Sequence, residues 1–480
     1  MWTWHIKSIA IILDVVYNHA FGQCPLVQLY WDDANSRPAS DSPYFNVTAK
    51  HPYNVGYDFN HESQATKYYV KQGLEHWIEN YHVDGFRFDL SKGFTQKYSS
   101  SDSQMAAYDA TRIAILEEYA DFIWDINPDV YVILEHFADN TEEKELANYG
   151  LMLWGNNNYQ YNEATMGYGS NLTNMLYTYK GWNEPNLVGY MESHDEERLM
   201  YKNLQYGNSF GDYNIKDLNT ALDRMKLAGT FFFLIPGPKM MWQFCETGYE
   251  YSLYTCSNGT TVDDDCKLEP KPIRWDYLED EYRKSIYNTY SSLTYLKKEF
   301  DVFNSADFTY SLNYYVKSLH LNNADMNATI LGNFNVVSNS VTTGFQHTGM
   351  WYEFFTGDSI NVTDTNMVIT FDPGEYRLYT DKKIQNSFIT STDNVISSGD
   401  YTIFPNPSSQ YVFILGGDNQ LHDSQIELFD ITGKRVISQK DISYDNQIVQ
   451  LDISGLENGV YIIRIKTDNK ISFNKIIVSK

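Results

Sequence analysis

Short apolar runs alternate with longer segments of helical periodicity from residue 9 to about residue 245. This alternation is typical of repeated β-α units, in which the strands form a parallel sheet and the helices cover it. The helical spacing of apolar residues is clearest at 66–81 and 110–126. The apolar runs predict strands at 9–16, 83–88, 130–135, 151–154, 187–192 and, for the sixth strand, either 231–235 or 239–244.

This pattern changes along the chain. Between the first two predicted strands, residues 20–64 form a long excursion rich in Pro, Asn, Asp and Tyr. From residue 299 the chain shows short alternating runs with turn residues, which predicts a β-sandwich over 299–382. A polar linker follows at 383–400, and residues 401–480 return to the all-β pattern. We therefore expect a β/α domain at 1–298, a sandwich, a linker and a second small all-β domain.

The composition narrows the class of ligand. The chain of 480 residues and 55.7 kDa has a formal net charge of −26, so a nucleic acid would be repelled over most of its surface. Aromatic residues make up 16% of the chain, which suits surfaces that stack on flat ligands such as sugar rings. No apolar run approaches the ~20 residues of a membrane span. Asp14 interrupts the apolar opening, which we interpret as a core strand.

The four cysteines do not have the spacing of a zinc site, and we expect no organic cofactor. Cys24 and Cys245 lie far from each other in the sequence. Cys256 and Cys266 bracket a short polar loop. They either close a disulfide in an oxidising compartment or remain thiols, and the sequence leaves both alternatives open.

An arginine and an aspartate lie two positions apart in the apolar, aromatic stretch GFRFDLSKG at 85–93. Side chains at positions i and i+2 of a strand share a face, so Arg87 and Asp89 point the same way. Burying such an ion pair adds little net stability, because desolvation offsets most of the attraction. The pair therefore favours a functional role over a purely structural one.

Ionisable residues follow the apolar bodies of four predicted strands. In a β/α barrel the carboxyl ends of the strands carry the active site, so groups from separate strands meet there. Two or three carboxyl groups in one polar pocket indicate glycosidase chemistry, with a carboxylate nucleophile and a carboxylic acid that protonates the leaving oxygen. Arg87 would keep Asp89 ionised and oriented, whereas neighbouring carboxylates would raise the pKa of Glu135. The residues at the strand ends are Asp14, Asn18 and His19; Arg87 and Asp89; Glu135 and His136; and His194 and Asp195.

Four ordered motifs resemble the signatures of the alpha-amylase superfamily of glycoside hydrolases. They are DVVYNH (14–19), GFRFD (85–89), ILEHF (133–137) and ESHDEER (192–198). A further match, GYDFN (56–60), resembles the signature near the end of the family's protruding domain, which would explain the excursion at 20–64. Residues 231–250 are similar to the last barrel strand and its turn. The resemblance covers about residues 9–250 and implies a (β/α)8 TIM-type barrel.

The resemblance also implies a reaction and the residues that perform it. The reaction retains anomeric configuration at alpha-1,4, and sometimes alpha-1,6, glucosidic bonds of starch- or glycogen-type polysaccharides. Asp89 is implied as the nucleophile, Glu135 as the general acid/base and Asp195 as the carboxylate that clamps sugar hydroxyls and stabilises the transition state. The implied substrate-binding residues are His19, Arg87, His194 and Lys92.

A structural calcium ion is the cofactor that the resemblance implies, at the residues matching Asn18 and Asp58. The family frequently has Lys-His after the nucleophile, where this chain has Lys92 and Gly93. A glycine can supply a backbone carbonyl but no imidazole, so calcium binding stays open.

The C-terminal residues resemble a second family. The stretches 401–415, 426–439 and 451–465 look like the sorting domain of the Bacteroidetes type IX secretion system. This implies export by outer-membrane secretion machinery, so we expect a secreted or cell-surface protein. The alternative is an ordinary β-sandwich accessory or carbohydrate-binding domain.

The predicted strands are too few for a complete barrel. Six precede residue 245, the family's barrel has eight, and the first motif belongs to the third strand. Two absent strands would leave unpaired sheet edges. We therefore expect a barrel that lacks its first two β-α units, with a signal peptide lost from the same end. Three functions remain open: an alpha-glucan hydrolase, a branching enzyme or other glucosyl transferase, and a non-catalytic glucan-binding fragment.

Overall fold

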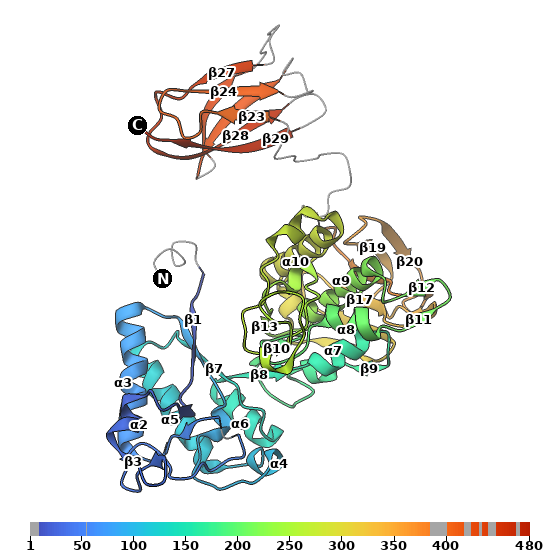
Figure 1. The fold of residues 1–480 in the computed structure, drawn as a ribbon. Coiled ribbons are helices and arrows are strands. Elements are labelled where there is room, and N and C mark those ends of the chain that lie inside the picture. Colours follow the sequence, from blue (N-terminus) through green and yellow to red (C-terminus); the bar gives the residue numbers. More distant parts are fainter. Residues whose placement is uncertain are drawn as a thin grey trace. The chain divides into compact units, whose positions relative to one another are not determined.

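Figure 1 shows the chain as a computed structural model. It describes residues 9–53, 55–384, 401–416, 424–431, 434–439, 448–466 and 471–480. The chain divides into two compact units, Met1–Phe388 and Ile389–Lys480. Of the predicted linker at 383–400, only Lys383 and Ile384 are among the described residues. No helix in the described part of the chain is both long and apolar enough to cross a membrane.

A six-stranded parallel sheet organises the first unit. Its strand order follows the order of the chain, and neighbouring strands pair in parallel, as in a β/α barrel. The strands are β1 (Ile12–Val15), β6 (Gly85–Phe88), β7 (Tyr131–Leu134), β8 (Met152–Asn156), β10 (Leu187–Tyr190) and β13 (Lys239–Met240). This confirms the predicted α/β class. That the barrel lacks its first two β-α units stays a prediction.

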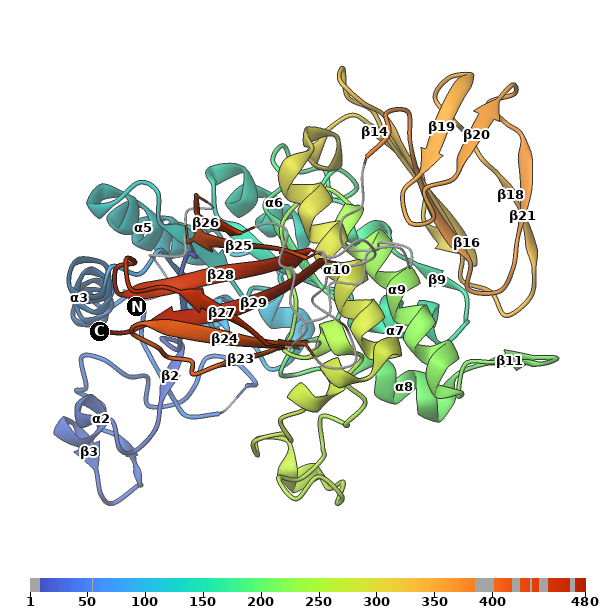
Figure 2. The same ribbon diagram turned by 90° about the horizontal axis from the view of Figure 1, so that it is seen from above.

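The sixth strand is β13, and the apolar run at 231–235 belongs mainly to the end of helix α9 (Leu218–Leu234). Phe231, Phe232 and Leu234 are fully buried in one core cluster. Helix α9 packs against helix α10 (Glu281–Glu299) and against strands of the following β-domain (Figures 1 and 2). A helix end that is buried all round has no polar face, so its sequence looks like that of a buried strand.

Helices connect the strands and cover the sheet. The longer ones are α3 (Gln64–Tyr81), α5 (Ala110–Ile126), α6 (Asn140–Tyr149), α7 (Asn158–Thr165) and α8 (Leu199–Tyr206). In α3, Val70, Leu74 and Ile78 are buried at four-residue spacing, and Ser63 caps the first turn by accepting a hydrogen bond from the N–H of Ala65. Helices α3 and α5 confirm both predicted helices. The shorter elements are α4 (Asp102–Met105), η1 (Ser91–Gly93), η2 (Thr173–Met175), η3 (Cys245–Thr247), η4 (Asp264–Cys266), η5 (Trp275–Glu279), η6 (Asp301–Asn304), β9 (Ser170–Asn171), β11 (Ser209–Phe210) and β12 (Tyr213–Asn214).

The excursion after β1 folds back on itself. Strand β2 (His19–Ala20) pairs antiparallel with β5 (Tyr57–Asp58), which returns the chain to the end of β1. A small apolar core stabilises the excursion, formed by Val27, Phe45 and Phe59. Between the paired strands lie α2 (Pro25–Leu29), β3 (Trp31–Asp32) and β4 (Arg37–Pro38).

An antiparallel β-domain completes the first unit. One sheet has the order β14-β16-β17-β22-β19-β20, and β18 pairs with β21. Arg224, fully buried on α9, donates hydrogen bonds to the carbonyls of Ala164, Thr165 and Phe334 and so ties α7 to this domain. The strands are β14 (Phe308–Ser311), β15 (Asn313–Tyr314), β16 (Val316–Leu321), β17 (Ala328–Asn333), β18 (Asn339–Thr342), β19 (Gly349–Glu353), β20 (Ser359–Val362), β21 (Val368–Phe371) and β22 (Tyr376–Thr380).

The second unit is all-β, as its alternating pattern predicts. Its described strands form one sheet of order β23-β24-β27 and another of order β26-β25-β28-β29, which share one apolar core. The strands are β23 (Tyr401–Phe404), β24 (Tyr411–Gly416), β25 (Gln425–Asp430), β26 (Arg435–Gln439), β27 (Ile448–Asp452), β28 (Gly459–Lys466) and β29 (Ile471–Val478).

Candidate active site

The carboxyl ends of β6 and β7 place Asp89 and Glu135 side by side. Phe88 is paired with Leu134 in the parallel ladder, and each carboxylate residue comes one position later. The ladder continues across them, because the N–H of Asp89 donates to Val15 (3.0 Å) and that of Glu135 to Phe88 (3.0 Å). The structure therefore brings together the two residues that the sequence predicts as a catalytic pair.

Arg87 contacts three carboxyl groups. Its Nη1 donates to Oδ1 of Asp14 (2.8 Å) and to Oδ1 of Asp89 (3.0 Å). Its Nη2 lies 3.0 Å from Oε2 of Glu135, but outside hydrogen-bonding geometry. The guanidinium is buried, and its Cζ lies 4.1 Å from the ring centre of Trp154. This stacking and the fork of donors hold Arg87 in one plane between the acids.

Glu135 has the perturbed pKa that a general acid needs. Burial raises the pKa of Glu135 to about 7. The positive charge of Arg87 and a hydrogen bond from the N–H of Leu90 (2.9 Å) lower this pKa. The charge and the side-chain hydrogen bond of Asp89 raise it. The direction agrees with the prediction from sequence. The main cause is burial, however, rather than the neighbouring carboxylate.

A tight turn after β6 holds Glu135 from the other side. Leu90 has a φ of 44°, in the left-handed region that aliphatic residues rarely adopt. This conformation directs its N–H to the Glu135 carboxyl group, and both the N–H and the Oγ of Ser91 donate to the Glu135 carbonyl at 2.9 Å. Strain of this kind is typical of functional sites.

The third predicted acid, Asp195, lies at the same end of the sheet. Its Oδ2 is 3.3 Å from Nε2 of His194, and its side chain is 45% exposed. Trp154 links the two parts of the site. Its ring lies 6.3 Å from the ring of His194, and the guanidinium of Arg87 stacks on it. Burial raises the pKa of the Tyr190 hydroxyl, and the charges of Glu196, Glu135 and Asp195 raise it further, so Tyr190 lies within electrostatic reach of both Glu135 and Asp195.

His19 lies beside the nucleophile candidate. Burial lowers its pKa, while the negative charge of Asp89 opposes that shift. In the β2–β5 ladder His19 is paired with Asp58, and its Nδ1 lies 3.3 Å from Nδ2 of Asn18. The predicted sugar ligand and the two predicted metal ligands are therefore neighbours.

Asn18 and Asp58 present buried oxygens without hydrogen-bond donors. Both residues are buried, and within the described part of the chain neither Oδ1 of Asn18 nor Oδ1 of Asp58 has a hydrogen-bond partner. Nε2 of His51 lies 3.2 Å from the Asp58 oxygen without hydrogen-bonding geometry. A Cβ at Gly93 would lie 1.9 Å from the Asn18 oxygen, so only glycine fits there. Unpaired buried oxygens of this kind suit a hard cation such as Ca²⁺.

Lys92, predicted to bind substrate, is paired within the protein. Its Nζ donates to Oδ1 of Asp102 (2.6 Å) and lies 5.1 Å from the ring centre of Tyr53, whose hydroxyl bonds the same carboxylate. That hydrogen bond is the largest of several causes that raise the pKa of Tyr53 to about 12, and the charge of Glu135 is among the others. Lys92 thus lies with Tyr53 and Asp102 near the acid.

Comparisons with known proteins agree with this geometry. Residues 402–479 match the family model of the secretion system C-terminal sorting domain. The chain is 23% identical over 340 residues to a malto-oligosyltrehalose trehalohydrolase of Saccharolobus solfataricus, covering 62% of this chain and 55% of that protein. It is 24% identical over 313 residues to alpha-amylase 3 of Dictyoglomus thermophilum, covering 60% and 54%. An Anoxybacillus alpha-amylase structure matches with a TM-score of 0.57 at 17% identity, over 78% of this chain and 76% of that one.

The motifs, the sheet and the curated relatives therefore agree. This chain is similar to alpha-amylases and related alpha-glucan enzymes. It spans about half the length of the curated relatives that it matches, and it carries a sorting domain at 402–479. The family match favours the sorting domain over an accessory sandwich.

Sequence reasoning missed two residues that touch the predicted site. Trp154, in the middle of β8, stacks on Arg87 and lies next to His194. An aromatic residue at the carboxyl end of a predicted strand was a signal for it. Lys267 donates from Nζ to Oδ1 of Asp195 (3.0 Å), and no local pattern predicts a contact between residues so far apart in the chain.

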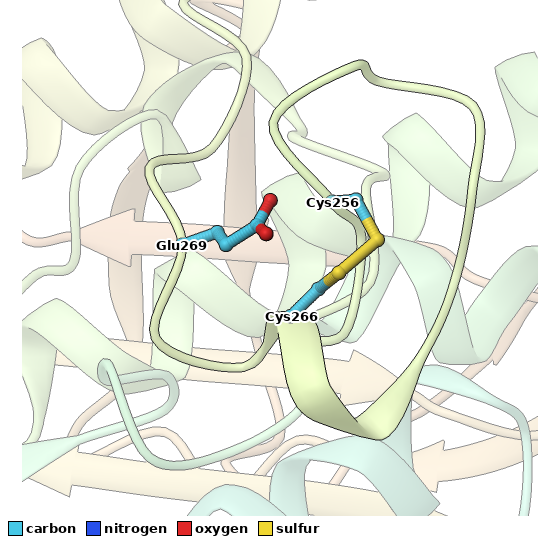
Figure 3. A group of neighbouring side chains, drawn as sticks. All are labelled: Cys256, Cys266 and Glu269. Atoms are coloured by element: carbon cyan, nitrogen blue, oxygen red, sulfur yellow. A yellow bond between two sulfur atoms is a disulfide. The ribbon is translucent and has the colours of Figure 1, made fainter.

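A disulfide holds the loop that delivers Lys267. Cys256 and Cys266 are bonded to each other, which decides between the two alternatives that the sequence left open (Figure 3). Glu269 lies beside the disulfide, but the bonded sulfurs offer no thiolate, so these three residues do not form a metal site. Near its start the loop is anchored by Glu197, which accepts hydrogen bonds from Ser252 Oγ (2.6 Å) and Leu253 N–H (2.8 Å).

Proposed function

We propose that this chain is a retaining glycoside hydrolase that cleaves alpha-1,4-glucosidic bonds of starch- or glycogen-type polysaccharides. The observation that carries the proposal is the shared contact of Arg87 with Asp89 and Glu135, together with a pKa of about 7 for Glu135. A retaining enzyme needs two adjacent carboxyl groups, one ionised and one protonated. The names of the curated relatives support an alpha-glucan as the substrate class.

The proposed reaction has two displacements. Asp89, oriented by the hydrogen bond from Arg87, attacks the anomeric carbon, while protonated Glu135 gives its proton to the departing glycosidic oxygen. The covalent glycosyl-enzyme is then hydrolysed by a water that Glu135, now a carboxylate, deprotonates. Asp195 would clamp hydroxyls of the reacting sugar, with His19 and His194 as further hydrogen-bonding groups. These roles are what the resemblance to the family implies for these positions.

A structural Ca²⁺ is a second part of the proposal. The carboxylate of Asp58 and the amide oxygen of Asn18 would hold it, with the Gly93 backbone close by. The ion would supply no acid or nucleophile. It would fix the end of the excursion against η1, and so position His19 beside Asp89.

We propose export by the type IX secretion machinery, to the cell surface or the medium. The match of residues 402–479 to the sorting domain supports this. The disulfide between Cys256 and Cys266 is also expected in an oxidising compartment.

Incubation of the purified chain with amylose tests the proposed reaction. We expect new reducing ends, released first in the alpha configuration, as followed by NMR. New alpha-1,6 branches without new reducing ends would instead support a branching enzyme or another glucosyl transferase, and retention on starch without either product would support a binding fragment. The Glu135→Gln variant should lose roughly 10²–10⁴-fold in rate. The matched control Glu79→Gln, on the exposed face of α3, should keep wild-type activity.

A further inference from the structure

A groove outside the candidate active site has the chemistry of a sugar-binding surface. It has a volume of about 750 Å³ and lies between α7, β9 and the β9-paired strand β15 of the β-domain. Tyr159 and Tyr314 line it with side chains that are 69% and 76% exposed, and Tyr315 is exposed beside them. Exposed aromatic rings stack on the apolar faces of sugars.

Three side-chain amides of this groove are free to bind a ligand. Within the described part of the chain, the side-chain amides of Gln160, Asn174 and Asn313 make no hydrogen bond, and no lysine or arginine lines the groove. Free amides can both donate to and accept from hydroxyl groups. A neutral polyhydroxylated ligand therefore fits this lining better than an anionic one, which would also be repelled by the net charge of −26.

Specific hydrogen bonds hold the backbone at Tyr314 in place. Tyr314 has a φ of 58°, a conformation that is uncommon for a bulky residue. The buried Nζ of Lys317 holds it there by donating to the carbonyls of Tyr314 (2.7 Å), Ser170 (2.9 Å) and Leu312 (3.1 Å). Because Tyr314 is exposed, core packing does not explain its strained backbone. Such strain points to a functional role for the residue.

This groove adjoins a second cavity that lies near the candidate active site. Asn174 lines it and also lines a second cavity of about 410 Å³, which is bordered by Phe137, Trp154 and Tyr179. Phe137 follows Glu135 by two residues, and Trp154 carries Arg87. The two cavities are therefore neighbours, and the second lies near the candidate acid. In a retaining glycosidase the acid faces the leaving group, so a glucan that extends from Glu135 towards these cavities would reach them with its leaving-group end.

We propose that these two neighbouring cavities bind the leaving-group end of a long alpha-glucan, with Tyr159 and Tyr314 stacking on sugar rings remote from the bond that is cleaved. This inference rests on the proposed function for its substrate. Binding energy from remote sugars is available only when the chain is long enough to reach the groove. The groove thus makes the enzyme selective for polysaccharide over short oligosaccharides.

A double variant, Tyr159→Ala with Tyr314→Asn, tests the proposal in the full chain. Asparagine tolerates the left-handed backbone at 314, so the ring is removed without new strain. Two readouts are needed: retention in native gels that contain amylopectin, and kcat/KM on amylose against maltotriose. We expect roughly tenfold weaker retention and a similar fall on amylose, from the loss of two stacking rings. The rate on maltotriose should stay within about twofold, because that substrate does not reach the groove.

Two controls make the result specific. Tyr314→Phe keeps the ring and should retain wild-type binding, and Tyr68→Ala removes a ring of matched exposure (67%) on α3 and should change nothing. Unchanged retention of the double variant, an equal fall on both substrates, or no retention of the wild type would each overturn the groove proposal. Wild-type retention that depends on the two tyrosines, but without hydrolysis of any glucan, would refute the proposed activity and leave the groove supported.

Discussion

The pH dependence of hydrolysis tests whether Glu135 acts as the general acid. Burial raises the pKa of Glu135 from its ordinary 4.5 to about 7. That difference corresponds to about 3 kcal/mol in favour of the protonated form, at ~1.36 kcal/mol for each pH unit. Because the acid must be protonated in the free enzyme, kcat/KM should have an alkaline limb with its midpoint near pH 7.

The fraction of protonated Glu135 sets the size of the effect. With a pKa of about 7, roughly nine-tenths of the enzyme carries the proton at pH 6 and roughly one-tenth at pH 8. We therefore expect kcat/KM to fall about tenfold between those two values. With an ordinary pKa, only about 3% of Glu135 would carry the proton at pH 6, and the limb would lie near pH 4.5.

The assay is the initial rate of reducing-end release from soluble malto-oligosaccharides between pH 4 and pH 9. The Glu79→Gln control should reproduce the wild-type profile, and the residual activity of Glu135→Gln should no longer show the alkaline limb. A wild-type limb below pH 5.5, or a limb that persists in Glu135→Gln, would refute the assignment of Glu135 and the burial argument behind its pKa.

Three further predictions test the surroundings of the pair. Replacing Arg87 with Met leaves the part-buried carboxyl groups of Asp89 and Glu135 without their cation. Urea unfolding at pH 7 should therefore show a loss of roughly 1–3 kcal/mol in the free energy of unfolding, and a smaller loss at pH 4, where carboxylates begin to protonate; an equal loss at both pH values would contradict this. Removal of Ca²⁺ with EDTA should lower the melting temperature of the wild type, and the Asn18→Ala variant should not respond to EDTA. A wild-type melting temperature that changes neither with EDTA nor with added Ca²⁺ would argue against the ion. Reduction of the disulfide should lower kcat/KM of the wild type several-fold but change kcat/KM of the Lys267→Met variant little, because the loop acts on Asp195 through that lysine. An equal fall of kcat/KM in both proteins would mean that the loop acts on the site by another route.

The sequence predicted the parts of the site that depend on strand ends. In parallel strands the residues after each apolar body meet at one edge, so the neighbourhood of Asp89 and Glu135 follows from pattern alone. The pattern could not decide between 231–235 and 239–244 for the sixth strand, because a helix end that is buried on all sides carries no amphipathic signal; the strand is β13, within 239–244. It could not find Lys267 either, since its contact with Asp195 depends on the course of a disulfide-bonded loop. Side-chain partners across long loops are tertiary facts that local periodicity does not encode.

One guanidinium treats the two members of the proposed pair differently, and this asymmetry is what the mechanism requires. Nη1 of Arg87 makes hydrogen bonds to Asp14 and Asp89, whereas Nη2 faces Glu135 at 3.0 Å without hydrogen-bonding geometry. A hydrogen bond to the charged form stabilises a carboxylate more than a nearby charge alone does. Arg87 therefore orients the Asp89 carboxylate through a hydrogen bond, while burial favours the protonated form of Glu135. A lysine at position 87 could not reproduce this division, because it has no planar fork to rest on Trp154 and to divide between the two acids.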